Sequence, residues 1–138
     1  MKKIIILFPL ILIPVSCYAQ PHNLNHYDFY VIPTNYTNEH AIQKSIEFWE
    51  QYGFNLQETD HKTKINIEFT DSCWNNGYGN ILGEYTKNDN AFIVISTSCF
   101  NSKLPENTVT KITEHELGHA LGFAHYSISI MNPRLDIK

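Results

Sequence analysis

The feature that most restricts how this chain can fold is the segment His115-Glu116-Leu117-Gly118-His119-Ala120-Leu121-Gly122-Phe123-Ala124-His125. Residues four apart on a helix share one face, with Cβ atoms about 5 to 6 Å apart, so His115 and His119 can approach one metal ion only if this segment is helical. From Asn107 or Thr108 onward the apolar residues recur at helical spacing, namely Val109, Ile112, Leu117, Ala120 and Leu121. The sequence therefore predicts a helix that runs up to Gly122 and carries two imidazoles on one side.

Gly122 and His125 extend this pattern beyond the helix. Glycine adopts the left-handed conformation that ends a helix, and the resulting bend returns His125 to the other two imidazoles. Three protein ligands leave one open position, which is typical of catalytic rather than structural zinc. Glu116 can reach a water molecule at that position as a general base. The full pattern arises by chance in about one chain of this length in twenty thousand. The alternative is an amphipathic helix that simply presents polar residues.

The remaining periodicity predicts a sheet and a second helix. Four segments alternate between apolar and polar residues or are rich in β-branched ones: 27–32, 65–70, 81–85 and 91–97. The near-continuous apolar run of the last segment favours a central strand covered on both faces. Apolar residues at helical spacing follow Asn38, a candidate N-cap, and stop at Gly53. The expected fold class is α+β, a twisted mixed sheet of about four to five strands with a backing helix and an active-site helix.

The first 19 residues have the layout of a secretory signal peptide. Met1-Lys2-Lys3 precedes an apolar run, residues 4–15, that is too short to span a bilayer, and Cys17 and Ala19 form a small-x-small cleavage site. We expect a mature chain of residues 20–138 that forms one compact domain, is secreted or periplasmic and has no membrane span. The alternative is a lipoprotein anchored through Cys17.

Removal of the signal peptide leaves Cys73 and Cys99 as the remaining cysteines. In an oxidising compartment they predict a disulfide, and closing a loop of about 27 residues stabilises a small domain by roughly 3 kcal/mol in the chain-entropy model. Two buried free thiols are the alternative. A role as zinc ligands is disfavoured because the histidine set is already complete.

The charge distribution argues against nucleic acid as a partner. Loss of Lys2 and Lys3 with the signal peptide changes the formal net charge from −4 to −6, and the ten basic residues are scattered along the chain. A nucleic-acid-binding domain requires a basic patch or stripe, which this sequence does not predict.

The histidine segment, followed by Ser129-Ile130-Met131-Asn132-Pro133, resembles the metzincin metallopeptidases and their Met-turn. The resemblance implies that Met131 lies beneath the zinc ligands. The Met-x-Pro form, and Asn80-Ile81-Leu82-Gly83, which is similar to the upper edge strand of the family, point to the matrixin branch. Matrixins usually carry serine directly after the third histidine, whereas here Tyr126 precedes Ser127. The resemblance covers most of the mature chain, and its specific part is residues 115–133.

This resemblance implies a secreted zinc-dependent endopeptidase that acts as a monomer. One catalytic Zn²⁺ would be held by His115, His119 and His125, and Glu116 would be the general base for the zinc-activated water. A protein or peptide substrate in extended conformation would pair with the edge strand at Ile81, Leu82 and Gly83. The chain ends at Lys138, seven residues after Met131, where the family carries a closing helix, so we expect a domain shortened after the Met-turn.

A protein of a different class remains compatible with the same residues. It is a catalytically inactive, zinc-containing module that binds extended peptides without cutting them. Retention of Glu116 argues against this alternative, because a module that only binds peptides has no need of a general base.

Overall fold

A computed structural model of the protein describes residues 25–34, 38–77 and 79–134. The predicted signal peptide at 1–19, including Cys17, lies outside the described residues. The elements in chain order are β1 (His26–Val31), α1 (Glu39–Glu50), β2 (Asn55–Glu58), β3 (Ile65–Thr70), β4 (Trp74–Asn75), β5 (Asn80–Ile81), β6 (Gly83–Lys87), β7 (Ala91–Ser96), β8 (Ser98–Cys99), β9 (Ser102–Lys103), α2 (Glu106–Ala120) and the 3-10 helix η1 (Ser129–Met131).

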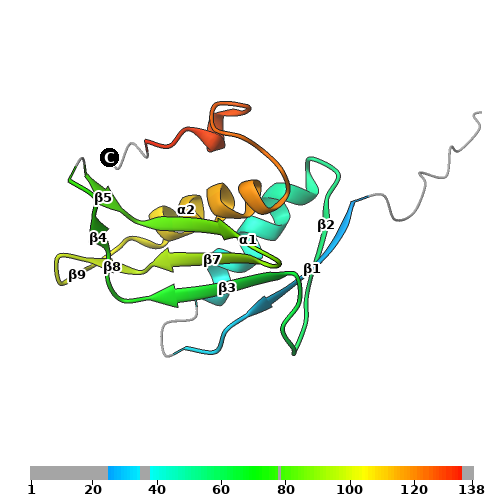
Figure 1. The fold of residues 1–138 in the computed structure, drawn as a ribbon, viewed down its shortest axis with the longest axis horizontal. Helices are drawn as coiled ribbons and strands as arrows, with labels where there is room; N and C mark the ends of the chain where they lie inside the picture. Colours follow the sequence, from blue (N-terminus) through cyan, green and yellow to red (C-terminus); the bar gives the residue numbers. More distant parts are fainter. Residues whose placement is uncertain (1–24, 35–37, 78, 135–138) are drawn as a thin grey trace, which may run out of the picture.

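Five of the strands form one mixed sheet in the order β2-β1-β3-β7-β6 (Figure 1). The first four are parallel to one another, whereas β6 runs antiparallel to β7 and forms one edge of the sheet. The short pairs β4-β5 and β8-β9 lie together beyond one end of this sheet. The prediction of an α+β fold with a mixed sheet of about four to five strands and two helices is confirmed.

Helix α1 begins where the sequence predicts it. The Asn38 side chain accepts a hydrogen bond from the Ala41 N–H at 3.2 Å, and this N-cap satisfies one of the free donors of the first turn. The buried face of α1 packs against α2, where the Trp49 indole donates to the Glu114 carbonyl at 3.0 Å. Gly53, with φ +84°, turns the chain after the helix toward β2.

The core lies between the sheet and the two helices. Val31, Ile67 and Ile93 form one row across three neighbouring strands, Phe69 and Ile95 form the next, and all five side chains are buried. Both helices cover this face (Figure 1). No helix in the described ranges is long and apolar enough to cross a membrane.

The prediction that the strand at 91–97 is covered on both faces is wrong. Phe92 and Val94 point away from the helices, beside Asn66 and Glu68 of β3, and remain half-buried. The apolar run indicated burial on both sides, but α1 and α2 lie on the face that carries Ile93 and Ile95.

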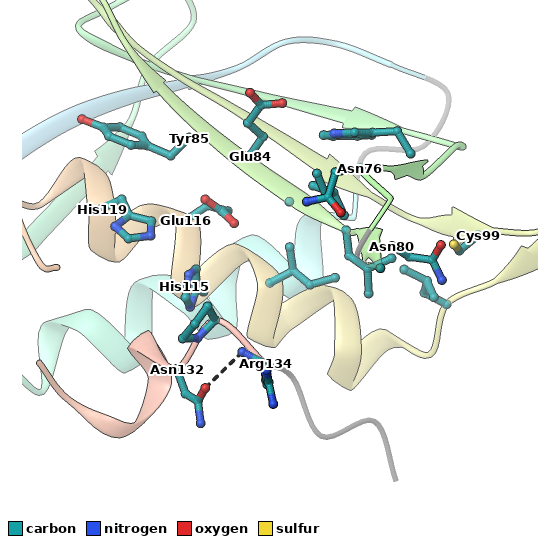
Figure 2. Close-up of a pocket in the computed structure, with 18 of the residues that line it drawn as sticks. Asn76, Asn80, Glu84, Tyr85, Cys99, His115, Glu116, His119, Asn132 and Arg134 are labelled. Carbon is teal, nitrogen blue, oxygen red and sulfur yellow. Dashed lines mark hydrogen bonds between the residues drawn. The ribbon is translucent and has the colours of Figure 1, made fainter. Parts of the chain in front are cut away.

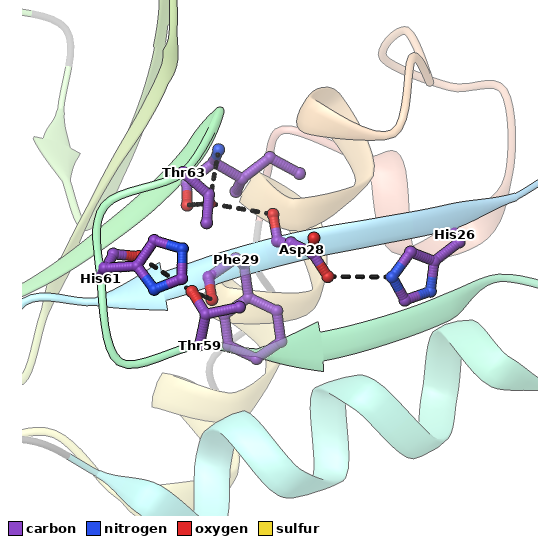
Figure 3. Close-up of polar contacts among 7 residues, drawn as sticks. His26, Asp28, Phe29, Thr59, His61 and Thr63 are labelled. Atoms are coloured by element: carbon purple, nitrogen blue, oxygen red, sulfur yellow. Dashed lines mark hydrogen bonds and ion pairs between the residues drawn. The ribbon is translucent and has the colours of Figure 1, made fainter.

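The loop that connects β2 and β3 is hydrogen-bonded to β1 through two threonine hydroxyls (Figure 3). Thr59 donates to the Phe29 carbonyl at 3.2 Å, and Thr63 donates to the Asp28 carbonyl at 3.0 Å. The Thr59 N–H also donates to the Phe29 carbonyl at 2.9 Å, so these bonds hold the mainly exposed loop against β1.

The predicted strand at 81–85 is divided between two sheets. Ile81 pairs with Trp74 in the small β4-β5 pair, whereas Gly83 begins β6 and pairs with Ile95. Leu82 lies between the two, and its carbonyl accepts a hydrogen bond from the Ser96 N–H at 2.8 Å. The backbone therefore continues as one extended rim from β5 into β6.

Candidate metal centre

The second half of α2 brings His115 and His119 to one side of the helix, above a tightly packed base. Met131 is fully buried there. Gly118 separates the two turns that carry the histidines, and a Cβ at this position would collide with the Met131 sulfur and would lie 2.7 Å from the Trp49 ring. The lack of a side chain at Gly118 allows the segment around η1 and α1 to pack directly beneath the histidines.

The turn after α2 returns the third histidine to the helix. Gly122 has φ +100°, and the next N–H, that of Phe123, donates to the Gly118 carbonyl at 2.9 Å, as in helix endings with a left-handed residue. His125 Nε2 then lies 3.1 Å from His119 Nε2. One nitrogen from each of His115, His119 and His125 lies within 4.8 Å of the other two, so the three residues form a group able to hold a metal ion.

Backbone carbonyls fix the orientation of two of these rings. His115 Nδ1 lies 2.9 Å from the Ile130 carbonyl, and His119 Nδ1 lies 2.9 Å from the Phe123 carbonyl. A carbonyl oxygen can only accept, so in each ring the proton is on Nδ1 and the lone pair is on Nε2. Both bonds also tie α2 to the chain that follows it.

The donor set fits a small divalent cation. Nitrogens at about 2.0 to 2.1 Å from a tetrahedral ion lie roughly 3.3 Å apart, close to the 3.1 Å between His119 Nε2 and His125 Nε2. With the proton of His125 on Nδ1, the lone pairs of both Nε2 atoms are available to a cation between them. Burial also lowers the pKa of His115 and His119, which favours the neutral, metal-binding form.

Glu116 lies on the same stretch of helix and faces β6. Its side chain is 6% exposed, and burial, with a smaller contribution from the Glu84 carboxylate, raises the pKa of Glu116 to about 7. A Cβ at Gly83 would lie 2.6 Å from Glu116 Oε1, so the carboxyl group sits directly against the backbone of the edge strand. An acid with this pKa can both take and return a proton near neutral pH.

The histidines and Glu116 line one end of a long cleft with a volume of about 1140 Å³ (Figure 2). The rim at Ile81, Leu82 and Gly83, predicted as the substrate edge strand, forms one wall. Tyr85 stacks on the His119 ring at a centroid distance of 5.8 Å, and Cys99 and Asn80 lie at the opposite end of the cleft. No pattern in the sequence singled out Tyr85 or Glu84, because their role depends on which residues face them across the cleft.

Cys73 and Cys99 form the predicted disulfide, with their Cα atoms 5.0 Å apart. It joins the segment entering β4 to the end of β8, so it connects the two small strand pairs at the far end of the cleft. The alternative of two free thiols is wrong.

Tyr126, the residue after the third histidine, has φ +63° and is exposed. Its N–H donates to the Met131 carbonyl at 3.0 Å.

The remaining described histidines have partners away from the cleft. His26 pairs with Asp28 at 2.9 Å (Figure 3), His61 pairs with Asp60 at 2.7 Å, and His40 pairs with Glu106 at 2.6 Å. His22 lies outside the described residues.

Comparison with protein-family models and with curated proteins found no match for this chain.

Proposed function

We propose that this protein is a secreted zinc-dependent endopeptidase of the metzincin type. The observation that carries the proposal is that three histidine nitrogens converge beside a buried carboxyl group in a cleft bounded by a sheet edge. Three ligands leave a coordination position open, and an acid next to that position is the arrangement used in metal-assisted hydrolysis.

His115, His119 and His125 would hold the ion. When bound, zinc supplies Lewis acidity that polarises a peptide carbonyl and lowers the pKa of a water molecule. Glu116 accepts the proton of the attacking water and then delivers it to the leaving amine. Burial raises the pKa of this carboxyl group and a neighbouring cation favours its ionised form, so Glu116 can accept a proton and release it again.

The edge strand orients the substrate. β6 is hydrogen-bonded to β7 along one side, and its other side borders the cleft. An extended peptide pairs with such an edge through main-chain hydrogen bonds, which give affinity without requiring a particular sequence. The scissile bond then lies near Gly83, next to Glu116.

The roles of Glu116 and His119 are tested by two substitutions. We expect Glu116→Gln to bind zinc as the wild type does while losing cleavage of a quenched peptide at least about a thousandfold, because no base activates the water. His119→Ala should lose the metal as well. Glu114→Gln is the matched control, since Glu114 lies on the same helix but does not line the cleft, and it should retain activity.

Zinc content measured on the same samples separates the proposal from its alternative. Chelator-sensitive cleavage by the wild type but not by Glu116→Gln supports the endopeptidase. Stoichiometric zinc without turnover in the wild type would instead identify a zinc-containing peptide-binding module.

A further inference from the structure

The end of the cleft opposite the histidines has a different chemical character. Among the described residues, the charged ones that line the cleft are Glu84, Glu116 and Arg134. Glu84 and Glu116 lie toward the histidines (Figure 2). The far end is lined by Trp74, Ile81, Phe100 and Leu104, together with the buried sulfur of Cys99. This end is therefore mainly apolar, with the amides of Asn76 and Asn80 at its border.

The disulfide brings together the two aromatic residues of this end. Trp74 directly follows Cys73, and Phe100 directly follows Cys99. With the two Cα atoms 5.0 Å apart, the cross-link holds Trp74 and Phe100 on neighbouring segments that are 26 residues apart in the chain. The disulfide thus keeps the backbone segments that carry the two aromatic residues close together.

Phe100 is exposed at the tip of the β8-β9 hairpin. Its side chain is 77% exposed, and its backbone has φ +50°, a conformation that bulky residues rarely adopt. Phe100 and Asn101, with φ +50° and +60°, form the two-residue turn between β8 and β9, and this turn presents the Phe100 side chain at the cleft rather than in the core. The cleft is continuous between Phe100 and the histidines, so the substrate of the proposed peptidase is the partner that can reach it.

We propose that Trp74 and Phe100 form a subsite that selects a large apolar side chain of the peptide substrate, aromatic or branched aliphatic. The distance between this subsite and the scissile bond follows from the residues of the rim, 81–83. Ile81, which pairs with Trp74, is two residues before Gly83, and two strand residues span about 7 Å. The selected side chain therefore belongs to a residue two or three positions from the bond next to Glu116. The position of the scissile bond in this inference rests on the proposed function, whereas the preference for an apolar side chain does not.

The test uses decapeptides in which one phenylalanine is moved through an alanine-glutamine host with lysine at each end. Cleavage sites and rates are measured for the wild type by mass spectrometry, and binding of the same peptides is measured on Glu116→Gln. We expect phenylalanine at a single position, two or three residues from the cut, to raise kcat/KM about tenfold over alanine.

The subsite is probed with Phe100→Asn, which removes the ring while asparagine tolerates the left-handed backbone. It should abolish the preference for phenylalanine, so that kcat/KM for the phenylalanine peptides falls about tenfold, to that of the alanine peptides. Tyr52→Asn is the control, because Tyr52 is also an exposed aromatic residue (47%) but does not line the cleft. A preference that persists in Phe100→Asn would overturn the subsite.

The two arms also distinguish failure of the subsite from failure of the proposed function. If the wild type cuts none of the peptides, but their binding depends on phenylalanine and on Phe100, the subsite is supported and the hydrolytic function is rejected. If peptides are cut with a preference that does not involve Phe100, the hydrolytic function is supported and the subsite is rejected.

Discussion

At the scale of single residues, close packing at two glycines decides how the candidate site is assembled. Gly118 allows Met131 and Trp49 to lie directly beneath the histidines, and Gly83 allows α2 to lie directly against the edge strand. Both are contacts between segments far apart in the chain. In each case a methyl group would occupy space that another side chain already fills.

We predict that Gly83→Ala is destabilising and impairs cleavage. The added Cβ would lie 2.6 Å from both Glu116 Oε1 and Ile112 Cγ2, so β6 and α2 must separate. Overpacking of this kind costs about 1 to 3 kcal/mol in the free energy of unfolding, measured by denaturant titration. Gly83→Ala should also lower kcat, because Glu116 is displaced from its position beside the edge strand.

Gly79→Ala is the comparison for stability. A Cβ at Gly79 meets nothing within 4 Å, so its free energy of unfolding should stay within about 0.5 kcal/mol of the wild type. Equal stability of the two variants would show that β6 and α2 do not approach as closely as described.

At the scale of elements, the turn after α2 determines whether the third histidine reaches the other two. We predict that Gly122→Ala loses about 1 to 2 kcal/mol of stability, because φ +100° is unfavourable for a residue with a Cβ, and that zinc affinity falls roughly tenfold or more. Affinity is measured by competition with a chromophoric chelator.

Gly53 provides a matched control for this turn. It also has a positive φ (+84°) and open space where a methyl group would be added, but it follows α1, away from the histidines. Gly53→Ala should therefore lose similar stability and keep the zinc affinity. A parallel fall in affinity would mean that the effect of Gly122→Ala is not local to the metal centre.

The elements with strong periodicity could be predicted from the sequence. α1 with its Asn38 cap, β1, β3, β7 and the helical start of the histidine segment all follow from apolar spacing, although α2 begins at Glu106, one or two residues earlier than expected. β2 was not predicted, since Leu56 is its one buried residue and its pairing with β1 supplies the rest of its stabilisation.

The short strands depend on tertiary structure instead. β4, β5, β8 and β9 contain two residues each, too few for any period, and the Cys73–Cys99 bond connects the segments in which they form. The histidines, Gly122 and Met131 could be named from their order in the chain. The contacts of Gly83, Glu84 and Tyr85 could not, because they arise only when β6 meets α2.

At the scale of the whole molecule, an ion held by the three histidines would join α2 to the segment that follows it. We predict that zinc raises the midpoint of thermal unfolding and that a chelator lowers it, because the three ligands converge only in the folded state. At a free zinc concentration one hundred times the Kd, the gain is about 2.7 kcal/mol.

Differential scanning calorimetry on the metal-loaded and chelated protein measures this shift. His125→Ala should unfold at the same temperature in both conditions, because it lacks the third ligand. Zinc-dependent stabilisation that survives this substitution would place the ion elsewhere on the protein.

The hairpin of β8 and β9 has a consequence for how this protein can diversify. Phe100 and Asn101 at its tip are exposed and lie outside the core, and the adjoining disulfide anchors the base of the hairpin. Substitutions at the tip by residues that tolerate the positive φ of the turn should therefore cost little stability, whereas the residues around the histidines are closely packed. Under the proposed function, selectivity could therefore change at the hairpin tip without any change around the histidines.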